Sequence, residues 1–169
     1  MCGIIGQIAF AGRDSGEQGA NIIPGLMPLM ARRGPDDQGV WSDGRWCSLG
    51  FRRLAVIDPS PAGGQPMLTR DGRYCLVYNG EVYNFRELRP ELERDGTRFR
   101  SSGDTEVVLY ALARWGLGAL SRFNGMFALG FYDSVDKRLL LARDHAGIKI
   151  ERAPFNHLTA AKAKHFRDG

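Results

Sequence analysis

The sequence predicts an α+β domain in which helices pack on an antiparallel or mixed sheet. Short β-like runs occur both before and after two amphipathic helical segments, whereas a βαβ series would alternate strand with helix. The chain has 169 residues, of which 43% are hydrophobic, and this is enough to bury a core of its own. We therefore expect one folded domain with no internal repeats.

Strands are predicted wherever short runs rich in β-branched and aromatic residues are bounded by turn residues. These runs are Ile4–Phe10, Val40–Ser42, Ser48–Phe51, Leu54–Asp58, Tyr74–Tyr78, Met126–Asp133 and Arg138–Ala142. The pair Asn79-Gly80 lies between two such runs, a pattern typical of a tight β-hairpin turn.

The two amphipathic helices are predicted in the middle of the chain. The first follows Asn84 and ends before Gly96, because apolar residues recur there at helical spacing. The second runs over Thr105–Trp115, with Asp104 as its N-cap. The residues with helical spacing in the two segments are Phe85, Leu88 and Leu92, and Val108, Leu112 and Trp115.

Two further helices are expected nearer the ends of the chain. Ile22–Ala31 has helical character, but Pro24 and Pro28 confine or kink it. In the tail, Ala160–Phe166 predicts a short basic helix whose length makes it marginal alone.

Composition excludes several classes of function. The formal charge is +4, but the arginines are scattered among acidic residues and form no stripe typical of nucleic-acid binding. No apolar run approaches the roughly 20 residues that span a bilayer, and no targeting pattern is visible, so we expect a cytoplasmic protein. The cysteines Cys2, Cys47 and Cys75 are odd in number and lack CxxC spacing, which argues against a disulfide framework and a zinc site. We expect Cys47 and Cys75 to be buried thiols.

Cys2 is the candidate nucleophile. Removal of Met1 would place a thiol and a free α-amino group on one residue. The pKa of an α-amine is about 7.7–8.0 and that of a thiol about 8.5, so the amine can take the thiol proton near neutral pH. The alternative is that Cys2 is a small hydrophobic residue at the start of a buried strand.

Four polar clusters lie between the predicted elements, at residues 32–36, 52–54, 79–81 and 102–104. Each has an ordinary structural explanation, such as a turn at Gly34-Pro35-Asp36 or a helix cap at Asp104. Together with Cys2, however, they supply the groups that amide hydrolysis requires. These are a thiol, oxyanion donors from an amide side chain and a glycine N–H, and charges of both signs to hold a zwitterion.

These residues stand in strings that resemble the class II glutamine amidotransferases. The strings are MCGIIG at the start, RRGPD at 32–36, RLAVID at 53–58, GGQPM at 63–67, YNGEVYNFRELR at 78–89, SGDTEV at 102–107, FNGMFA at 123–128 and ARDHAGIK at 142–149. They occur in family order and with family spacing over residues 1–149. RGPD, and YNGE followed by YN, are most similar to the glutaminase domain of glutamine-dependent asparagine synthetases.

The resemblance implies an N-terminal-nucleophile hydrolase fold, a four-layer α/β/β/α sandwich of antiparallel sheets, and an enzyme that hydrolyses glutamine to glutamate and ammonia. In it, Cys2 attacks the glutamine amide and forms a thioester, while Asn79 and Gly80 supply the oxyanion hole. Arg53, Leu54, Val56, Glu81 and Asp104 would bind the substrate. Arg33 and Asp36 would shape a loop that supports or covers the site.

The C-terminus departs from the family pattern after Lys149. The resemblance therefore implies an amidotransferase domain over residues 1–149, incomplete at its C-terminus and lacking the last strands, followed by a divergent tail over 150–169. We expect no cofactor in this chain, because ATP and Mg would belong to a synthetase domain that the sequence does not contain, and no metal site. Expected partners are glutamine, a separate synthetase chain and a second copy of the chain, with no nucleic acid and no membrane. The alternative function is a catalytically inactive truncated remnant that acts as a binding or regulatory module.

Overall fold

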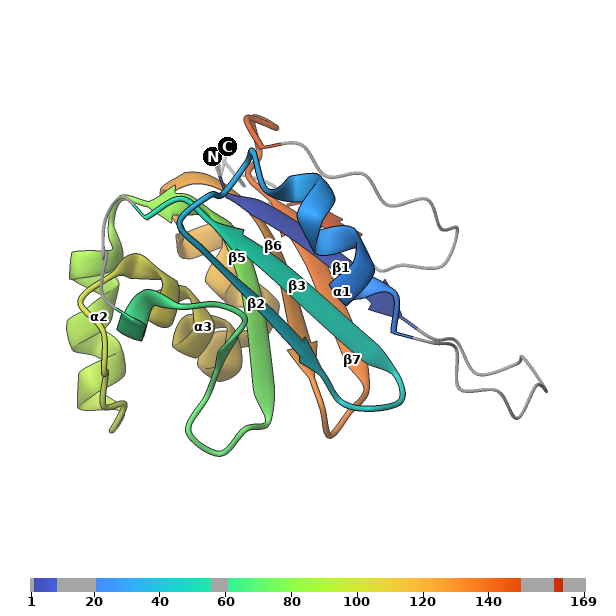
Figure 1. Cartoon of the computed structure of the whole chain (residues 1–169). Coiled ribbons are helices and arrows are strands. Elements are labelled where there is room, and N and C mark those ends of the chain that lie inside the picture. Colours follow the sequence, from blue (N-terminus) through green and yellow to red (C-terminus); the bar gives the residue numbers. More distant parts are fainter. Residues whose placement is uncertain (1, 9–20, 56–60, 150–159, 163–169) are drawn as a thin grey trace.

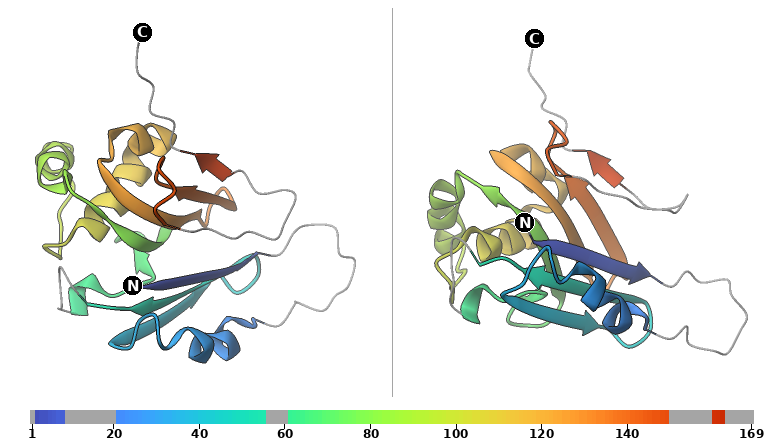
Figure 2. Two further views of the ribbon diagram at one scale, coloured as in Figure 1. Left: turned by 90° about the horizontal axis from the view of Figure 1, so that it is seen from above. Right: turned by 45° about the horizontal axis from the view of Figure 1, so that its top comes forward.

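A computed structural model describes residues 2–8, 21–55, 61–149 and 160–162 of the chain. Two sheets lie face to face, and each carries helical segments on its outer side, so that four layers follow one another in the order α/β/β/α (Figures 1 and 2). This is the arrangement that the family resemblance predicts.

The smaller sheet has the strand order β1-β3-β2 and is antiparallel throughout. Its strands are β1 (Gly3–Ile8), β2 (Asp37–Ser42) and β3 (Cys47–Arg53). Its outer face is covered by helix α1 (Ile23–Leu26) and the 3₁₀ turn η1 (Met27–Met30), each with a proline in its first turn. The predicted early helix is therefore confirmed, as two short pieces divided where the prolines restrict the chain.

The larger sheet has the order β4-β5-β6-β7-β8. Its strands are β4 (Met67–Leu68), β5 (Tyr74–Val82), β6 (Gly125–Asp133), β7 (Arg138–Arg143) and β8 (Ala160–Lys162). A 3₁₀ turn, η2 (Pro61–Gly63), precedes β4. Neighbouring strands from β4 to β7 are antiparallel, and β8 pairs with β7 in parallel. The central strands β5 and β6 pair along their whole lengths.

Helices α2 (Phe85–Arg94) and α3 (Asp104–Trp115), with the 3₁₀ segment η3 (Gly116–Arg122), cover the outer face of the larger sheet. Their apolar faces and that side of the sheet form one core cluster, in which Leu92, Leu109 and Leu112 are fully buried. Burying one such leucine side chain contributes about 1.5–3 kcal/mol. Both central helices are thus confirmed, and their docking fixes the N-terminus of α3 against β5.

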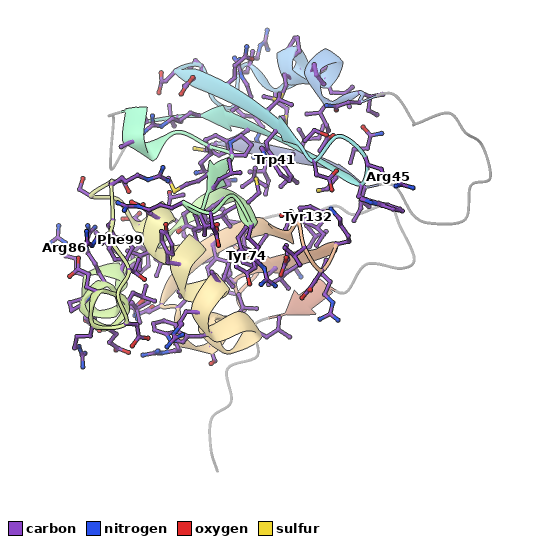
Figure 3. All side chains as sticks on the ribbon, turned by 90° about the horizontal axis from the view of Figure 1, so that it is seen from below. Trp41, Arg45, Tyr74, Arg86, Phe99 and Tyr132 are labelled. Atoms are coloured by element: carbon purple, nitrogen blue, oxygen red, sulfur yellow. The ribbon has the colours of Figure 1, made fainter. Side chains whose placement is uncertain are left out.

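A second core cluster fills the space between the two sheets. Trp41 of β2 and Tyr132 of β6 meet there with ring centroids 5.7 Å apart (Figure 3). Cys47 and Cys75 belong to this cluster and are buried free thiols, as predicted. The cluster holds the sheets together and fixes the position of β1 relative to β5.

The predicted hairpin at Asn79-Gly80 is wrong, because β5 runs straight through both residues. A Cβ atom on Gly80 would lie 2.4 Å from the Met126 carbonyl oxygen and 2.6 Å from Phe127 Cβ. The glycine is therefore needed for the close approach of β5 to β6, and its sequence context was misinterpreted as a turn.

Three other local predictions need correction. The strand predicted over Leu54–Asp58 is absent at Leu54 and Ala55, where β3 has already ended, and its remaining residues lie outside the described part of the chain. The N-cap of α3 is Gly103, and Asp104 is the first helical residue. Residues 160–162 form β8 and not a helix, because the edge of β7 offers a strand partner to a segment with little helical stability of its own.

Candidate active site

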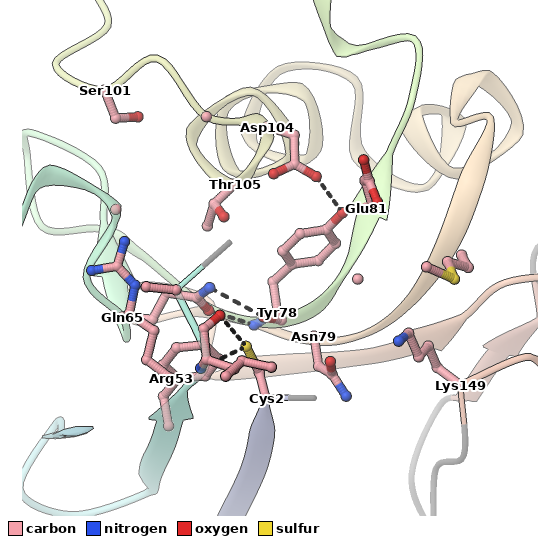
Figure 4. A pocket seen from close by; sticks show the side chains of 17 residues that line it. Cys2, Arg53, Gln65, Tyr78, Asn79, Glu81, Ser101, Asp104, Thr105 and Lys149 are labelled. Carbon is pink, nitrogen blue, oxygen red and sulfur yellow. Dashed lines mark hydrogen bonds between the residues drawn. The ribbon is translucent and has the colours of Figure 1, made fainter. Parts of the chain in front are cut away.

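One end of the sandwich contains a cavity of about 280 Å³. Seven of the predicted site residues line it: Cys2, Arg53, Leu54, Asn79, Gly80, Glu81 and Asp104. The eighth, Val56, lies outside the described residues. Residues that are far apart in the sequence therefore meet in one place (Figure 4).

Cys2 reaches the cavity because of the register of the smaller sheet. Gly3 pairs with Arg52 across β1 and β3, so the residue before Gly3 lies beside the end of β3. The Cys2 Sγ accepts a hydrogen bond from the Leu54 N–H at 3.3 Å and lies 3.5 Å from the Leu54 carbonyl oxygen. The side chain is only partly buried, so its thiol is accessible from the cavity.

The RRGPD segment supports the loop that follows β3. Asp36 donates its N–H to the Arg53 carbonyl oxygen at 3.0 Å, and its Oδ2 accepts the Ala55 N–H at 2.7 Å. A Cβ atom on Gly34 would lie 2.4 Å from the Arg52 carbonyl carbon, so this segment packs directly on the end of β3. Asp36 thus holds the main chain that carries Arg53 and Leu54, in line with the supporting role that we expected. Arg33 does not line the cavity.

Asn79 and Gly80 lie on β5 beside the cavity, past Leu76, which is the last residue of β5 to pair with β4. The residues that flank them are held by side chains. The Tyr78 N–H donates to Gln65 Oε1 at 2.6 Å, and the Val82 N–H donates to Asp104 Oδ2 at 2.9 Å. The segment that carries the expected oxyanion donors is therefore fixed on both sides.

Asp104 is almost completely buried at the N-terminus of α3, and its Oδ2 also accepts the Tyr78 hydroxyl at 2.7 Å. Burial is the largest influence on the pKa of Asp104 and raises it. The hydrogen bonds from Tyr78 and Val82 oppose this effect without cancelling it. Burial, with the nearby Asp104 charge, also raises the pKa of Tyr78 well above its ordinary value. The carboxylate is therefore in an environment where a bound cation would be strongly favoured.

Charges of both signs meet in the cavity. Asp104, which accepts the Tyr78 hydroxyl, and Glu81 line the same cavity as Cys2 (Figure 4). Arg53 is 7% exposed and supplies a guanidinium group to the same cavity. A ligand with an ammonium and a carboxylate group could therefore find a partner for each.

Several cavity residues had no assigned role in the sequence interpretation: Phe51, Gln65, Tyr78, Ser101, Thr105 and Lys149. Gln65, Tyr78, Thr105 and Lys149 stand inside four of the quoted strings, which was the only signal available. Ser101 is held by the fully buried Glu106, whose Oε2 accepts the Ser101 N–H and hydroxyl, both at 2.8 Å.

Among the described residues, no group of three or more His, Cys, Asp or Glu side chains could hold a metal ion. No helix in the same ranges is long and apolar enough to cross a membrane.

Comparisons with known proteins show the family of this chain. Residues 1–162 match the model of the glutamine amidotransferase domain family. Asparagine synthetases 1 and 3 of Bacillus subtilis, both glutamine-hydrolysing, are 38% and 36% identical to this chain over 149 and 151 residues. A Mycobacterium bovis protein, named provisionally as the same kind of synthetase, is 39% identical over 161 residues.

Each of these three alignments covers 88% of this chain but only 23–24% of the relative, so the chain spans about a quarter of their length. Among solved structures, a glutamine phosphoribosylpyrophosphate amidotransferase from B. subtilis superimposes with a TM-score of 0.49 at 21% identity. That alignment covers 60% of this chain and 24% of the other.

Proposed function

Since this chain belongs to the glutamine amidotransferase domain family, we propose that Cys2 hydrolyses glutamine to glutamate and ammonia in the cavity described above. The observation that carries the proposal is the meeting of the Cys2 thiol, the Asn79-Gly80 segment and charges of both signs around one cavity. A buried structural cysteine would not require such neighbours.

The chemistry follows from the groups present. The free α-amine of Cys2 takes the thiol proton, and the sulfur attacks the side-chain carbonyl carbon of glutamine, forming a C–S bond. The negative oxygen is stabilised by the Asn79 side-chain N–H and the Gly80 N–H. Collapse of this intermediate breaks the C–N bond, and the α-amine returns its proton to the leaving ammonia. Water then attacks the thioester, releasing glutamate and regenerating the thiol.

Substrate orientation is assigned to the charged residues. Arg53 binds the α-carboxylate of glutamine, for which a guanidinium fork is well suited. Asp104 and Glu81 receive the α-amino group. The main chain at Leu54 lines the cavity on the nucleophile side, and Val56 belongs to the same proposed substrate pocket.

The fate of the ammonia is proposed by analogy with the synthetases. Those relatives are about four times as long as the matched region, and their names join glutamine hydrolysis to asparagine synthesis. We assign to this chain the supply of ammonia for a similar amide transfer. The acceptor chemistry, with its ATP and Mg, then belongs to a separate synthetase chain. We also propose a cytoplasmic location and association with a second copy of the chain.

Removal of the nucleophile tests the proposal. Cys2→Ala should abolish ammonia release from glutamine, and mass spectrometry should show that Met1 is absent from the active protein. The matched control is Cys47→Ala, which removes a thiol from the same inter-sheet cluster and should keep most of the activity. If the unmodified chain, already free of Met1, releases no ammonia, the remnant hypothesis is favoured instead.

Thiol labelling gives an independent test that needs no turnover. Burial, with the nearby Asp43 charge, raises the pKa of Cys47 to about 12, and burial raises the pKa of Cys75 further still. Thiolates are the reactive species, so iodoacetamide should modify Cys2 of the folded chain at pH 8 and leave the other two unmodified. Rapid modification of Cys47 or Cys75 in place of Cys2 would contradict the proposed nucleophile.

A further inference from the structure

Gln65 occupies a special position in the larger sheet. Strand β4 pairs with β5 through only two residues, Met67 opposite Leu76 and Leu68 opposite Cys75. Extending this antiparallel register by two residues places Gln65 opposite Tyr78. Main-chain pairing does not extend that far, because β4 begins at Met67, and Pro66 has no N–H to donate.

The side chain of Gln65 replaces the missing strand partner. Its Oε1 accepts the Tyr78 N–H at 2.6 Å, and its Nε2 donates to the Tyr78 carbonyl oxygen at 3.1 Å (Figure 4). A glutamine amide carries one acceptor and one donor side by side, as a strand residue does. The ladder along this edge of β5 therefore continues through a side chain for one more residue.

The N–H of Gly80, an expected oxyanion donor, lies on this same edge of β5. Along a strand, the N–H and C=O groups of alternate residues point to the same neighbouring strand. Tyr78, Gly80 and Val82 therefore direct their N–H groups to the edge of β5 on the β4 side, where β4 no longer pairs with it. The Tyr78 N–H donates to Gln65, and the Val82 N–H donates to Asp104. The N–H of Gly80 lies between them and faces the cavity.

The Gln65 main chain is itself packed tightly. A Cβ atom on Gly39 of β2 would lie 2.1 Å from the Gln65 carbonyl oxygen, so this residue lies directly against the smaller sheet. Gln65 therefore connects the sheet that carries Cys2 to the strand that carries Asn79 and Gly80. Its two side-chain hydrogen bonds hold β5 at Tyr78, while its carbonyl group packs on β2.

We propose that Gln65 is a positioning residue for the oxyanion hole, which it aligns by holding the Tyr78 peptide opposite the nucleophile strand. This inference rests on the proposed glutaminase function. Both ends of the Gln65 side-chain amide bind the Tyr78 main chain. Gln65 acts through the geometry of β5.

The test compares Gln65→Met, which keeps the length of the side chain but removes both hydrogen bonds, with Gln38→Met. Gln38 also uses its side-chain amide, to accept from Arg52, but lies outside the cavity. We expect Gln65→Met to lower kcat for glutamine hydrolysis about 10- to 100-fold, with KM changed less than about twofold, because oxyanion contacts act in the transition state. Gln38→Met should change neither parameter.

Gln65→Glu adds a readout that a purely structural role would not move. Its ionised carboxylate can accept from the Tyr78 N–H but cannot donate to the carbonyl oxygen, whereas the protonated form does both. The kcat of this variant, divided by that of the unmodified protein at the same pH, should therefore rise about threefold or more from pH 8 to pH 5.5. A constant ratio would contradict the proposal.

Hydrogen exchange separates this inference from the proposed function. Exchange of the Tyr78 amide should accelerate about tenfold or more in Gln65→Met and not in Gln38→Met, whether or not the chain hydrolyses glutamine. If the unmodified protein is inactive, the proposed function fails, and exchange still decides whether Gln65 holds β5. The inference is overturned if exchange at Tyr78 is unchanged, or if an active protein keeps its kcat in Gln65→Met.

Discussion

Two tyrosine–aspartate pairs in the described part of the chain have nearly the same hydrogen-bond length, but the pKa of the carboxyl group is shifted in opposite directions. Tyr78 donates to Asp104 at 2.7 Å beside the cavity, and Tyr132 donates to Asp43 at 2.6 Å. The tyrosines lie on the neighbouring strands β5 and β6, but Tyr78 belongs to the core under the helices and Tyr132 to the core between the sheets. The same two side-chain types therefore occur in two different environments.

The environments decide the pKa of each carboxyl group. Burial raises the pKa of Asp43 less than its hydrogen bonds lower it. Those bonds come from Tyr132 and the N–H groups of residues 45–47, and they hold the pKa far below its usual range. At Asp104, burial outweighs the hydrogen bonds and raises the pKa. The hydrogen bonds of Asp43 more than offset the effect of burial, whereas those of Asp104 do not.

The largest contrast is expected in catalysis. Asp104→Asn should lower kcat/KM for glutamine about 100-fold, because it removes the charge-assisted contact that we propose to the α-amino group, worth about 3 kcal/mol. Asp43→Asn is the matched control and should change kcat/KM less than about threefold. Ammonia release at varied glutamine concentration measures both. Equal losses in the two variants would show that the two pairs do not differ in role.

The free energy of unfolding should be affected in the opposite order, more by Asp43→Asn than by Asp104→Asn. Asp43→Asn should lower the free energy of unfolding by about 2 kcal/mol, because the charge that its N–H donors and Lys137 stabilise is lost. Asp104→Asn should lower it by less than about 1 kcal/mol, or raise it, because it removes a buried charge that the fold compensates poorly. Urea unfolding of the two variants gives the comparison. A greater loss in Asp104→Asn would contradict it.

The fold was largely predictable from the sequence because periodic apolar patterns and the matched strings extend across most of it. Helices α2 and α3 follow from spacings such as Leu88 and Leu92, which are buried as expected. The prediction failed where a tertiary contact decides local structure. Asn79-Gly80 has the composition of a turn, but the approach of β6 makes it part of a strand.

The candidate site was predictable in its charged and nucleophilic members and not in its supporting ones. Cys2, Arg53 and Asp104 are recognisable from their chemistry and their strings. The partnership of Gln65 with Tyr78 depends on β4 beginning only at Met67, which no local pattern shows. Asp43 likewise reads as an ordinary turn residue until Tyr132, 89 positions away, is brought to it.

The tyrosine hydroxyls should give a smaller contrast of the same kind. Tyr78→Phe should raise KM for glutamine about fivefold near pH 7, because Asp104 loses a donor that favours its charged form. Tyr132→Phe should leave KM unchanged and lower the free energy of unfolding by about 1–1.5 kcal/mol. Steady-state kinetics and urea unfolding test both variants. An unchanged KM in Tyr78→Phe would mean that its hydroxyl does not prepare Asp104 for the substrate.

The smallest effect is a difference in the pH dependence of stability, and it distinguishes the two carboxyl groups by sign. The folded-state pKa of Asp104 is raised, so the folded protein binds this proton more tightly than the unfolded chain does. Its penalty is absent at low pH and grows as the pH rises from about 3.9 through the raised value. The folded-state pKa of Asp43 is lowered, so its contribution is complete above about 3.9 and is lost as the pH falls further.

Unfolding should therefore be measured for both Asn variants at several pH values. From neutral pH down to about 4, the unmodified protein should gain stability relative to Asp104→Asn and hold a constant advantage over Asp43→Asn. Below about pH 4, the stability advantage of the unmodified protein over Asp43→Asn should shrink. Each slope is bounded by about 1.4 kcal/mol per pH unit, the limit for one proton. Parallel curves for the two variants would show that the environments of the two pairs do not differ as their contacts indicate.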